Sequence, residues 1–150
     1  MKSKCATENE NLILIVEDED ASYFFLSVYL KKAGLNFERA SSGFDAIEKC
    51  AFNQSISMVI LDIRLHDLNG IWVCKTIKKM RPELKVIIET ALSDQENKEL
   101  AFNAGANGYY IKPLAYKELL DSIYSELNIF AESINSGDSK KVEQGKDHME

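Results

Sequence analysis

Five polar side chains, widely separated in the sequence, are of the types that carry out phosphoryl chemistry. They are Glu17, Asp18, Asp62, Thr90 and Lys112. Carboxylates in one cleft repel one another unless a cation lies between them, and Mg²⁺ is the usual ion for oxygen ligands. A lysine ammonium and a threonine hydroxyl suit the oxygens of a phosphate. If these side chains meet, they could support phosphoryl transfer, in which a carboxylate can itself be the nucleophile.

Each of these residues stands at the end of a short run with the character of a buried strand. The runs cover Leu12–Val16, 58–61, Lys85–Thr90 and Gly108–Ile111. Parallel strands place their carboxyl ends at one edge of a sheet, and open α/β sheets bind their ligands at that edge. We therefore expect the five polar side chains to converge there.

Longer amphipathic stretches alternate with these runs and predict helices. The predicted helices cover 21–33, 44–52, 71–80, 94–104 and Tyr116–Leu127, and a weak further strand is predicted over Asn36–Ala40. Gly34 and Gly105 follow two of the helices and should end them. The five strand–helix repeats predict an α/β fold, a doubly wound five-stranded parallel sheet with helices on both faces and right-handed crossovers.

The composition predicts a single folded domain with its own core. The chain has 150 residues, of which 45% are apolar and 28% are charged. No apolar run approaches the roughly 20 residues of a membrane span, and none has the form of a signal peptide. Three widely spaced cysteines fit a reducing compartment, so we expect a cytoplasmic protein with no membrane partner. The formal charge of −6 disfavours direct binding to nucleic acid.

The two ends of the chain lack the apolar patterning of its middle. Residues 1–10 predict a flexible leader. Residues 131–150 predict a polar, disordered tail, which has too few apolar residues for a DNA-binding helix-turn-helix. The predicted folded domain is therefore 11–130.

The motifs around the five polar residues resemble those of the receiver domains of two-component response regulators. The motifs are Val16-Glu17-Asp18-Glu19, the segment 62–70, Thr90-Ala91 and Tyr109-Tyr110-Ile111-Lys112-Pro113. Each is weak alone, but all four at strand ends form a specific signal that spans 11–127. The resemblance implies a flavodoxin-like (CheY-like) fold with strand order 2-1-3-4-5. It also implies a phosphoacceptor signalling domain of a phosphorelay rather than an enzyme.

The resemblance implies a role for each matching residue. Asp62 would accept a phosphoryl group from the phosphohistidine of a sensor histidine kinase or a His phosphotransfer protein. Asp18, Asp62 and the backbone carbonyl of Arg64 would bind Mg²⁺ directly. Glu17 would act at the metal through water.

A second group of residues is implied to hold the phosphoryl group and transmit its presence. Thr90 and Lys112 would bind the oxygens of the aspartyl phosphate, and Tyr109 would turn inward when Thr90 moves toward them. The bond between Lys112 and Pro113 would be cis, which X–Pro bonds allow at small cost. Gly70 would begin the helix after the phosphorylation loop.

Three residues depart from the usual pattern of the family. Glu17 replaces the more frequent Asp, which is a common variant. His66 stands where a Pro is usual, so the loop after Asp62 should be less rigid, and we expect His66 to be solvated rather than a metal ligand. Glu89 lies inside the fourth strand, where an apolar or amide residue is expected. We predict that Glu89 reaches solvent or a cation, or has a raised pKa.

The output surface should lie on the domain itself, because the polar tail carries no effector domain. The resemblance places it on the fourth helix, fifth strand and fifth helix, around Asn97, Phe102, Tyr109 and Tyr116. A downstream protein effector would bind there, and the chain would be a monomer or a phosphorylation-linked dimer. The same chemistry would also suit a relay that passes the phosphoryl group onward.

Other functions remain compatible with part of the pattern. The chain could be the receiver piece of a hybrid histidine kinase, or a receiver-fold adaptor that works without phosphorylation. A phosphatase of the haloacid-dehalogenase type also uses an Asp nucleophile and Mg²⁺. That class requires a second acid two residues after the nucleophile, where this chain has Arg64, so the phosphatase is disfavoured.

Overall fold

The computed structural model describes residues 11–129, so the predicted leader and tail, 1–10 and 131–150, lie outside the described residues. Five strands form one parallel sheet in the order β2-β1-β3-β4-β5. They are β1 (Leu12–Val16), β2 (Asn36–Ala40), β3 (Ile56–Leu61), β4 (Lys85–Thr90) and β5 (Gly108–Ile111). The predicted doubly wound sheet and its strand order are confirmed.

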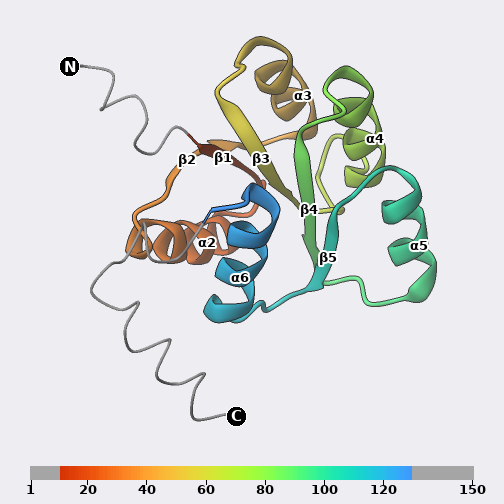
Figure 1. Ribbon diagram of the computed structural model, residues 1–150. Helices are drawn as coiled ribbons and strands as arrows, with labels where there is room; N and C mark the ends of the chain where they lie inside the picture. Colours follow the sequence, from red (N-terminus) through yellow and green to blue (C-terminus); the bar gives the residue numbers. More distant parts are fainter. Residues whose placement is uncertain (1–10, 130–150) are drawn as a thin grey trace.

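Five helices cover the two faces of the sheet. They are α2 (Asp20–Lys32), α3 (Gly43–Phe52), α4 (Gly70–Met80), α5 (Gln95–Asn103) and α6 (Tyr116–Leu127). Helices α3, α4 and α5 lie on one face, and α2 and α6 lie on the other (Figure 1). Within residues 11–129, every helix is too short or too polar to cross a membrane.

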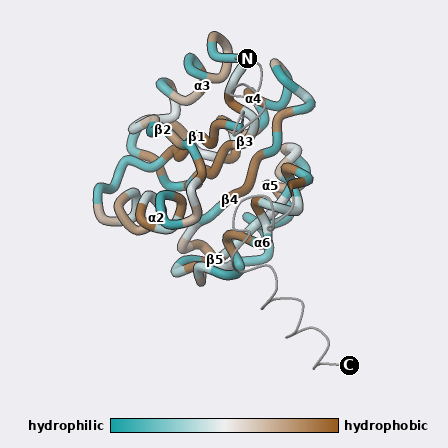
Figure 2. The backbone as a smooth tube through the Cα atoms, turned by 60° about the vertical axis from the view of Figure 1, so that its left-hand side comes forward, coloured by the Kyte–Doolittle hydropathy of each residue, from teal (hydrophilic) through white to brown (hydrophobic). Residues whose placement is uncertain are grey.

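The strands are buried on both faces because successive side chains point to opposite sides. In β1, Leu14 and Val16 belong to the core beneath α3, α4 and α5. Ile13 and Ile15 belong to the second core, beneath α2 and α6. The apolar strands therefore run through the middle of the molecule (Figure 2), and polar residues are left for their ends.

Some boundaries differ from the sequence prediction by one or two residues. Strand β3 begins at Ile56 and includes Ser57, which interrupts the apolar run but donates a hydrogen bond to Asn11 Oδ1 at 3.0 Å. Helix α5 begins one residue later than predicted, because Asp94 is its N-cap and accepts a hydrogen bond from the backbone of Asn97. Helix α2 ends before Gly34, whose φ of +75° is the left-handed conformation that ends many helices.

Candidate functional site

Three of the predicted polar residues form one hydrogen-bonded cluster at the carboxyl edge of the sheet. Lys112 Nζ donates to Glu17 Oε1 and to Asp62 Oδ2, with both distances 2.9 Å. Ser22 Oγ, on the first turn of α2, lies 3.3 Å from the same ammonium. The convergence of residues that are distant in sequence is therefore observed, and Ser22 is an additional partner that its position in the sequence did not indicate.

The sheet register fixes these side chains relative to one another. Val16 in β1 pairs with Leu61 in β3, so the next residues, Glu17 and Asp62, leave the two strands at the same level. The Asp62 N–H donates to the Val16 carbonyl at 3.3 Å, and the Lys112 N–H donates to the carbonyl at the end of β4 at 2.8 Å. Regular backbone bonding thus extends up to the residues of the cluster.

The cluster is almost shielded from solvent. Glu17 is 2% exposed and Asp62 is 8% exposed. Burial raises the pKa of Glu17, although its hydrogen bond with Lys112 opposes the rise. Burial also disfavours the charged form of Lys112, but hydrogen bonds to Glu17 and Asp62 outweigh that effect and raise its pKa above the ordinary lysine value. Lys112 therefore stays an ammonium ion between two acids.

Asp18 lies beside the cluster and contacts the loop that follows β3. The backbone N–H of His66 donates to Asp18 Oδ2 at 2.6 Å, and His66 Nδ1 lies 2.9 Å from the same oxygen. The His66 side chain is 67% exposed, so the prediction of a solvated side chain is confirmed. The expectation of a merely solvated residue missed the contact with Asp18, because only the folded chain brings positions 18 and 66 together.

A second carboxylate anchors the same loop on its other side. Asp67 accepts hydrogen bonds from the backbone N–H groups of Gly43 and Phe44, each at 2.9 Å. The slight burial of Asp67 would raise its pKa, but these backbone hydrogen bonds lower it. Asp67 therefore caps α3 from outside the helix, and the loop is tied both to Asp18 and to α3.

The loop ends at a residue that has no room for a side chain. A Cβ atom on Gly70 would lie 2.2 Å from the Asp62 carbonyl oxygen and 2.6 Å from the Ile63 Cα. The Gly70 N–H donates to the Ile63 carbonyl at 2.8 Å, which closes the loop on itself. Gly70 begins α4, as the sequence predicted, and its close approach to β3 explains the glycine.

Thr90 and Tyr109 are connected through the main chain of one residue. The Leu92 N–H donates to Thr90 Oγ1 at 3.3 Å, and the Tyr109 hydroxyl donates to the Leu92 carbonyl at 2.7 Å. Thr90 is fully buried, whereas Tyr109 is half-buried against the core. Thr90 and Tyr109 are therefore connected indirectly. The sequence alone did not show that the main chain of Leu92 joins them.

A cavity of about 320 Å³ opens at this edge and contains the set of predicted metal ligands. Its walls are Glu17, Asp18, Glu19, Ser22, Asp62, Arg64, Ala91 and Lys112. The acids and the main chain supply oxygen ligands, which fits Mg²⁺. Within the described part of the chain, no three acidic, histidine or cysteine side chains form a preformed metal cage. Mg²⁺ does not need one, because it usually keeps several waters and binds one or two carboxylates.

Glu89 lies one residue before Thr90 and is 6% exposed. Burial raises the pKa of its carboxyl to about 7, while the charge of Lys112 acts in the opposite direction. Among residues 11–129 no group donates a hydrogen bond to this carboxyl or forms an ion pair with it. Of the three outcomes predicted for Glu89, namely solvent, a cation or a raised pKa, its burial agrees with the raised pKa. Its environment differs sharply from that of Glu17.

The predicted output residues lie on three elements, α5, β5 and α6. Phe102 on α5 is exposed, and Tyr109 is half-buried on β5. The Asn97 side chain donates to the N-cap Asp94. The Tyr116 ring instead packs edge-on against Tyr29 of α2, with the ring centroids 5.1 Å apart. Helix packing therefore turns the Tyr116 ring toward α2, and the output surface stays a prediction.

Comparison with known proteins defines the class of this protein. The family model of the response regulator receiver domain matches residues 13–124. The chain therefore belongs to the receiver domain family of response regulators, which is a signalling family. The site built from Glu17, Asp18, Asp62, Thr90 and Lys112 lies wholly within the matched range.

Individual relatives agree with this assignment. Transcriptional regulatory protein ZraR of Salmonella typhimurium is 33% identical over 115 residues, which are 77% of this chain and 26% of that protein. Response regulator ArlR of Staphylococcus aureus is 35% identical over 111 residues, 74% of this chain and 50% of its own length. The chain thus spans half or less of these curated relatives.

A solved structure gives the same fold. The CheY-like receiver domain protein of Methanospirillum hungatei JF-1 is 30% identical, with a TM-score of 0.74 over 79% of this chain and 94% of that chain. The receiver domain of sensor histidine kinase PA1611 from Pseudomonas aeruginosa PAO1 is 24% identical, with a TM-score of 0.72 over 78% of this chain and 97% of its own. That structure has a magnesium ion coordinated in the active site cleft.

Proposed function

We propose that this chain is a phosphoacceptor switch, in which Asp62 receives a phosphoryl group from a phosphohistidine. The observation that carries the proposal is the buried Asp62 carboxylate at the end of β3, with Lys112 Nζ 2.9 Å from its Oδ2. The donor would be a sensor histidine kinase or a His phosphotransfer protein. Membership of the receiver family supports this chemistry.

In the proposed transfer, an Asp62 oxygen attacks phosphorus, and the bond between phosphorus and the imidazole nitrogen of the donor breaks. The Lys112 ammonium, now shared between Glu17 and Asp62, would turn to an oxygen of the incoming group and neutralise part of its charge. The buried Thr90 hydroxyl would donate to another oxygen. These residues hold and neutralise the group, so the protein assists only its own phosphorylation and dephosphorylation.

The acids around the cavity would hold Mg²⁺ as the cofactor. Asp18, Asp62 and the backbone carbonyl of Arg64 would be the direct ligands, and Glu17 would act through water. When bound, Mg²⁺ supplies positive charge to the phosphoryl oxygens. The contact between Asp18 and His66 would then have to adjust, because the same Asp18 oxygen accepts both hydrogen bonds from His66.

The switch would act through Thr90 and Tyr109. If the Thr90 hydroxyl turns to the phosphoryl group, the hydrogen bond from Leu92 N–H to Thr90 Oγ1 is lost. The segment that accepts the Tyr109 hydroxyl bond would move with it. Because Tyr109 lies on β5 beside α5, a downstream protein effector would detect the change on the α5–β5–α6 face. The oligomeric state, monomer or phosphorylation-linked dimer, and the cytoplasmic location stay predictions.

Intact mass spectrometry tests the phosphoacceptor directly. The full chain is incubated with acetyl phosphate or phosphoramidate, with and without Mg²⁺, beside Asp62→Asn and the matched surface control Asp121→Asn. We expect one phosphoryl adduct in the wild type and in Asp121→Asn, and none in Asp62→Asn or without metal. An adduct that persists in Asp62→Asn would contradict the assignment of Asp62.

The absence of any adduct in folded wild-type protein would favour the alternative of a phosphorylation-independent adaptor. Such an adaptor would bind its partner equally well before and after Asp62→Ala. The receiver piece of a hybrid histidine kinase would give the same adduct as a separate response regulator. It is supported only by the likeness to the receiver domain of sensor histidine kinase PA1611.

A further inference from the structure

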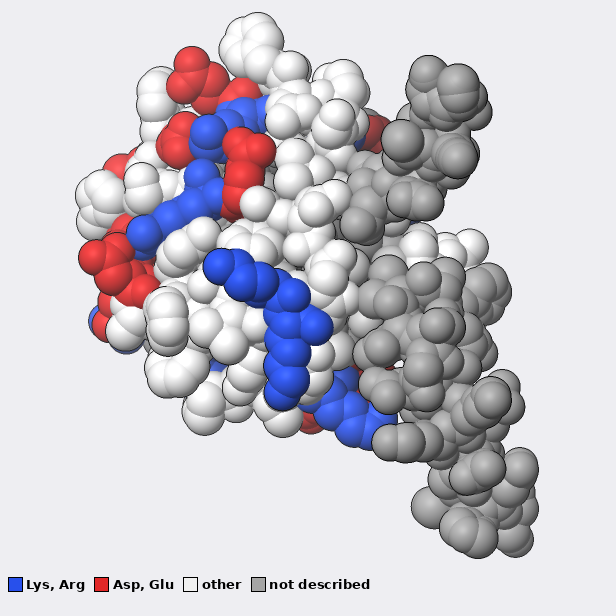
Figure 3. Space-filling view, turned by 90° about the vertical axis from the view of Figure 1, so that its left-hand side faces the viewer, with Lys and Arg blue, Asp and Glu red and all other residues white. Residues whose placement is uncertain are grey.

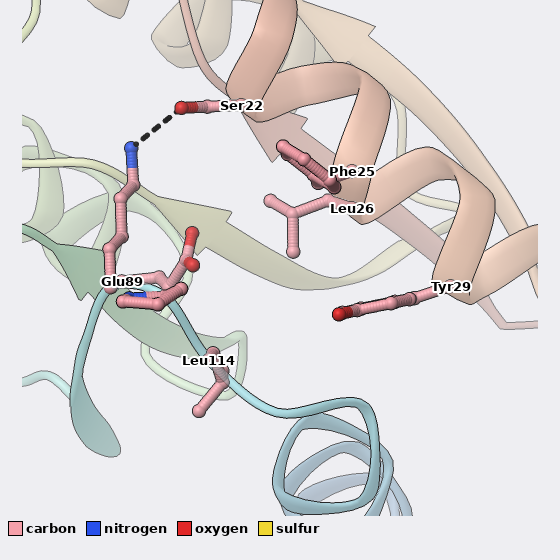
Figure 4. Close-up of a pocket in the computed structure, with 8 residues that line it drawn as sticks. Ser22, Phe25, Leu26, Tyr29, Glu89 and Leu114 are labelled. Atoms are coloured by element: carbon pink, nitrogen blue, oxygen red, sulfur yellow. Dashed lines mark hydrogen bonds between the residues drawn. The ribbon is translucent and has the colours of Figure 1, made fainter.

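A second cavity of about 320 Å³ lies beside the phosphoacceptor cavity, between α2 and the segment that follows β5 (Figure 4). Phe25, Leu26 and Tyr29 line it from α2, and Leu114 lines it from the opposite side. These walls are apolar and aromatic, and Ser22, Lys112 and Pro113 complete the lining beside Glu89. The volume is at the lower end for small-molecule sites, which suits a ligand of one ring rather than a nucleotide.

The Glu89 carboxyl points into this cavity from β4 (Figure 4). Among the described residues it has no hydrogen-bond or ion-pair partner, although the residue is 94% buried, being 6% exposed. No fully buried side-chain oxygen in residues 11–129 lacks a partner. The unpaired Glu89 oxygens must therefore touch accessible space, and the cavity is that space.

The charges around the Glu89 carboxyl favour a cation. Glu17, Asp62 and Lys112 are the charged groups that act on Glu89. The Lys112 ammonium already donates to Glu17 and Asp62, so it neutralises only one of three carboxylates. When Glu89 ionises, the group carries a net charge of −2, from three negative charges and one positive charge. A ligand that brings one positive charge would reduce this net charge to −1.

The mouth of the cavity is also apolar. Phe25, at its edge, is 64% exposed, and Phe24 and Val28 on the same helix are exposed as well. Figure 3 shows the side of the molecule on which α2 lies, where uncharged side chains flank a stripe of Lys and Arg side chains that crosses the middle of the face. An apolar body could therefore enter beside α2 and place a charged head against Glu89.

We propose that this cavity is a binding site for a small organic cation with a planar apolar body, such as an aromatic amidine, with Glu89 as the group that binds its charge. An amidinium offers parallel N–H donors that match the two oxygens of a carboxylate. The Tyr29 ring and the apolar walls would contact the body of the ligand. The proposal does not depend on the phosphoacceptor function.

The test is a titration of the ¹⁵N-labelled full chain with benzamidine in Mg²⁺-free buffer, followed by NMR. We expect saturable shifts at the amides of Phe25, Leu26, Glu89 and Leu114, with a dissociation constant on the order of 1 mM, as for a fragment-sized ligand. Benzyl alcohol and benzoate, which share the ring but lack the positive charge, should bind at least about tenfold more weakly. Equal binding of benzoate would overturn the proposal.

Three variants locate the interaction. Glu89→Gln should weaken benzamidine binding about tenfold or more, whereas Glu96→Gln, on the exposed first turn of α5, should leave it unchanged. Asp18→Asn removes an acid of the neighbouring cavity only, so binding should persist. Binding that is lost in Asp18→Asn and retained in Glu89→Gln would move the ligand to the metal cavity and refute the site.

Discussion

Two glutamates at the same edge of the sheet are buried to a similar degree but have opposite surroundings. Glu17 accepts a hydrogen bond from Lys112 Nζ at 2.9 Å and another from the Glu19 N–H at 3.1 Å. Glu89 has neither kind of partner among the described residues and opens into an apolar cavity. Burial raises the pKa of both carboxyls, to about 7 for Glu89.

The difference shows how hydrogen-bond partners change the situation of a buried acid. Glu17 is part of a set in which one ammonium holds two carboxylates together, so its charge has a defined use. Glu89 bears a cost of burial that no hydrogen bond within residues 11–129 offsets, although the charge of Lys112 opposes part of it. The same edge of the sheet therefore holds one buried glutamate with hydrogen-bonding partners and one without them among the described residues.

Lys112→Met should have the largest effect, because it removes the cation that donates to Glu17 and whose charge acts on Glu89. Removing the ammonium deprives the phosphoryl group of a preorganised positive charge, so we expect phosphorylation by acetyl phosphate to slow about 100-fold or more. The rate is measured by intact mass over time. Lys117→Met, which removes an exposed lysine paired with Asp121 on α6, is the control and should keep the wild-type rate. A loss of less than about threefold in Lys112→Met would mean that Lys112 is not the phosphoryl ligand.

Glu89→Gln should change how the stability of the protein depends on pH. The pKa of Glu89 is about 7 in the folded protein and near 4.5 when unperturbed, so the unfolded chain loses its proton first. The stability of the wild type should therefore fall as pH rises from about 4.5 to about 7 and stay low above that. Glutamine has no proton to lose, so the variant should gain up to about 3 kcal/mol relative to the wild type over this window.

Urea unfolding at pH 4.5 and pH 8 measures that gain. Glu96→Gln is the matched control, because Glu96 is exposed at the start of α5. A difference between Glu89→Gln and wild type that is the same at both pH values would show that the Glu89 carboxyl finds a partner in solution. Phosphorylation of Asp62 should continue in this variant.

Asp67 is a third carboxylate to compare with the two glutamates: it is exposed, and both of its oxygens accept hydrogen bonds. Asp67→Ala should have the smallest effect of the three substitutions. Asp67 accepts two backbone N–H groups at the start of α3, so its loss should destabilise the protein by about 1 kcal/mol, as for other helix caps. Because hydrogen bonds lower the pKa of Asp67, this contribution should be present above its ordinary pKa of 3.8 and shrink as pH falls below it. Urea unfolding at pH 3 and pH 7, with Asp121→Ala as control, measures both effects.

Much of the fold follows from local patterns in the sequence. The continuous apolar runs and the amphipathic stretches between them were enough to predict every strand and helix within two residues. The strand order came from the family resemblance, since local periodicity does not say which strands are neighbours. The ends of β3 and α5 were displaced because single polar side chains, those of Ser57 and Asp94, bond locally in ways that hydropathy does not report.

The candidate site was predicted less completely than the fold. The resemblance identified the acids, Thr90 and Lys112, and an acid inside a strand was enough to predict the raised pKa of Glu89. The contacts of Asp18 with His66 and of Asp67 with α3 could not be predicted, because they join loops that only the tertiary structure brings together. The packing of Tyr116 on Tyr29 could not be predicted, because helix periodicity does not specify which neighbouring helix receives an aromatic ring.

The connection between Thr90 and Tyr109 runs through the peptide groups of Leu92, not through its side chain. Alanine scanning would therefore miss this residue, because Leu92→Ala keeps both the N–H and the carbonyl and alters only packing. Proline is the one standard residue without the N–H. Every residue except proline at position 92 would thus preserve the link between Thr90 and Tyr109, at a cost set by how its side chain packs against the core.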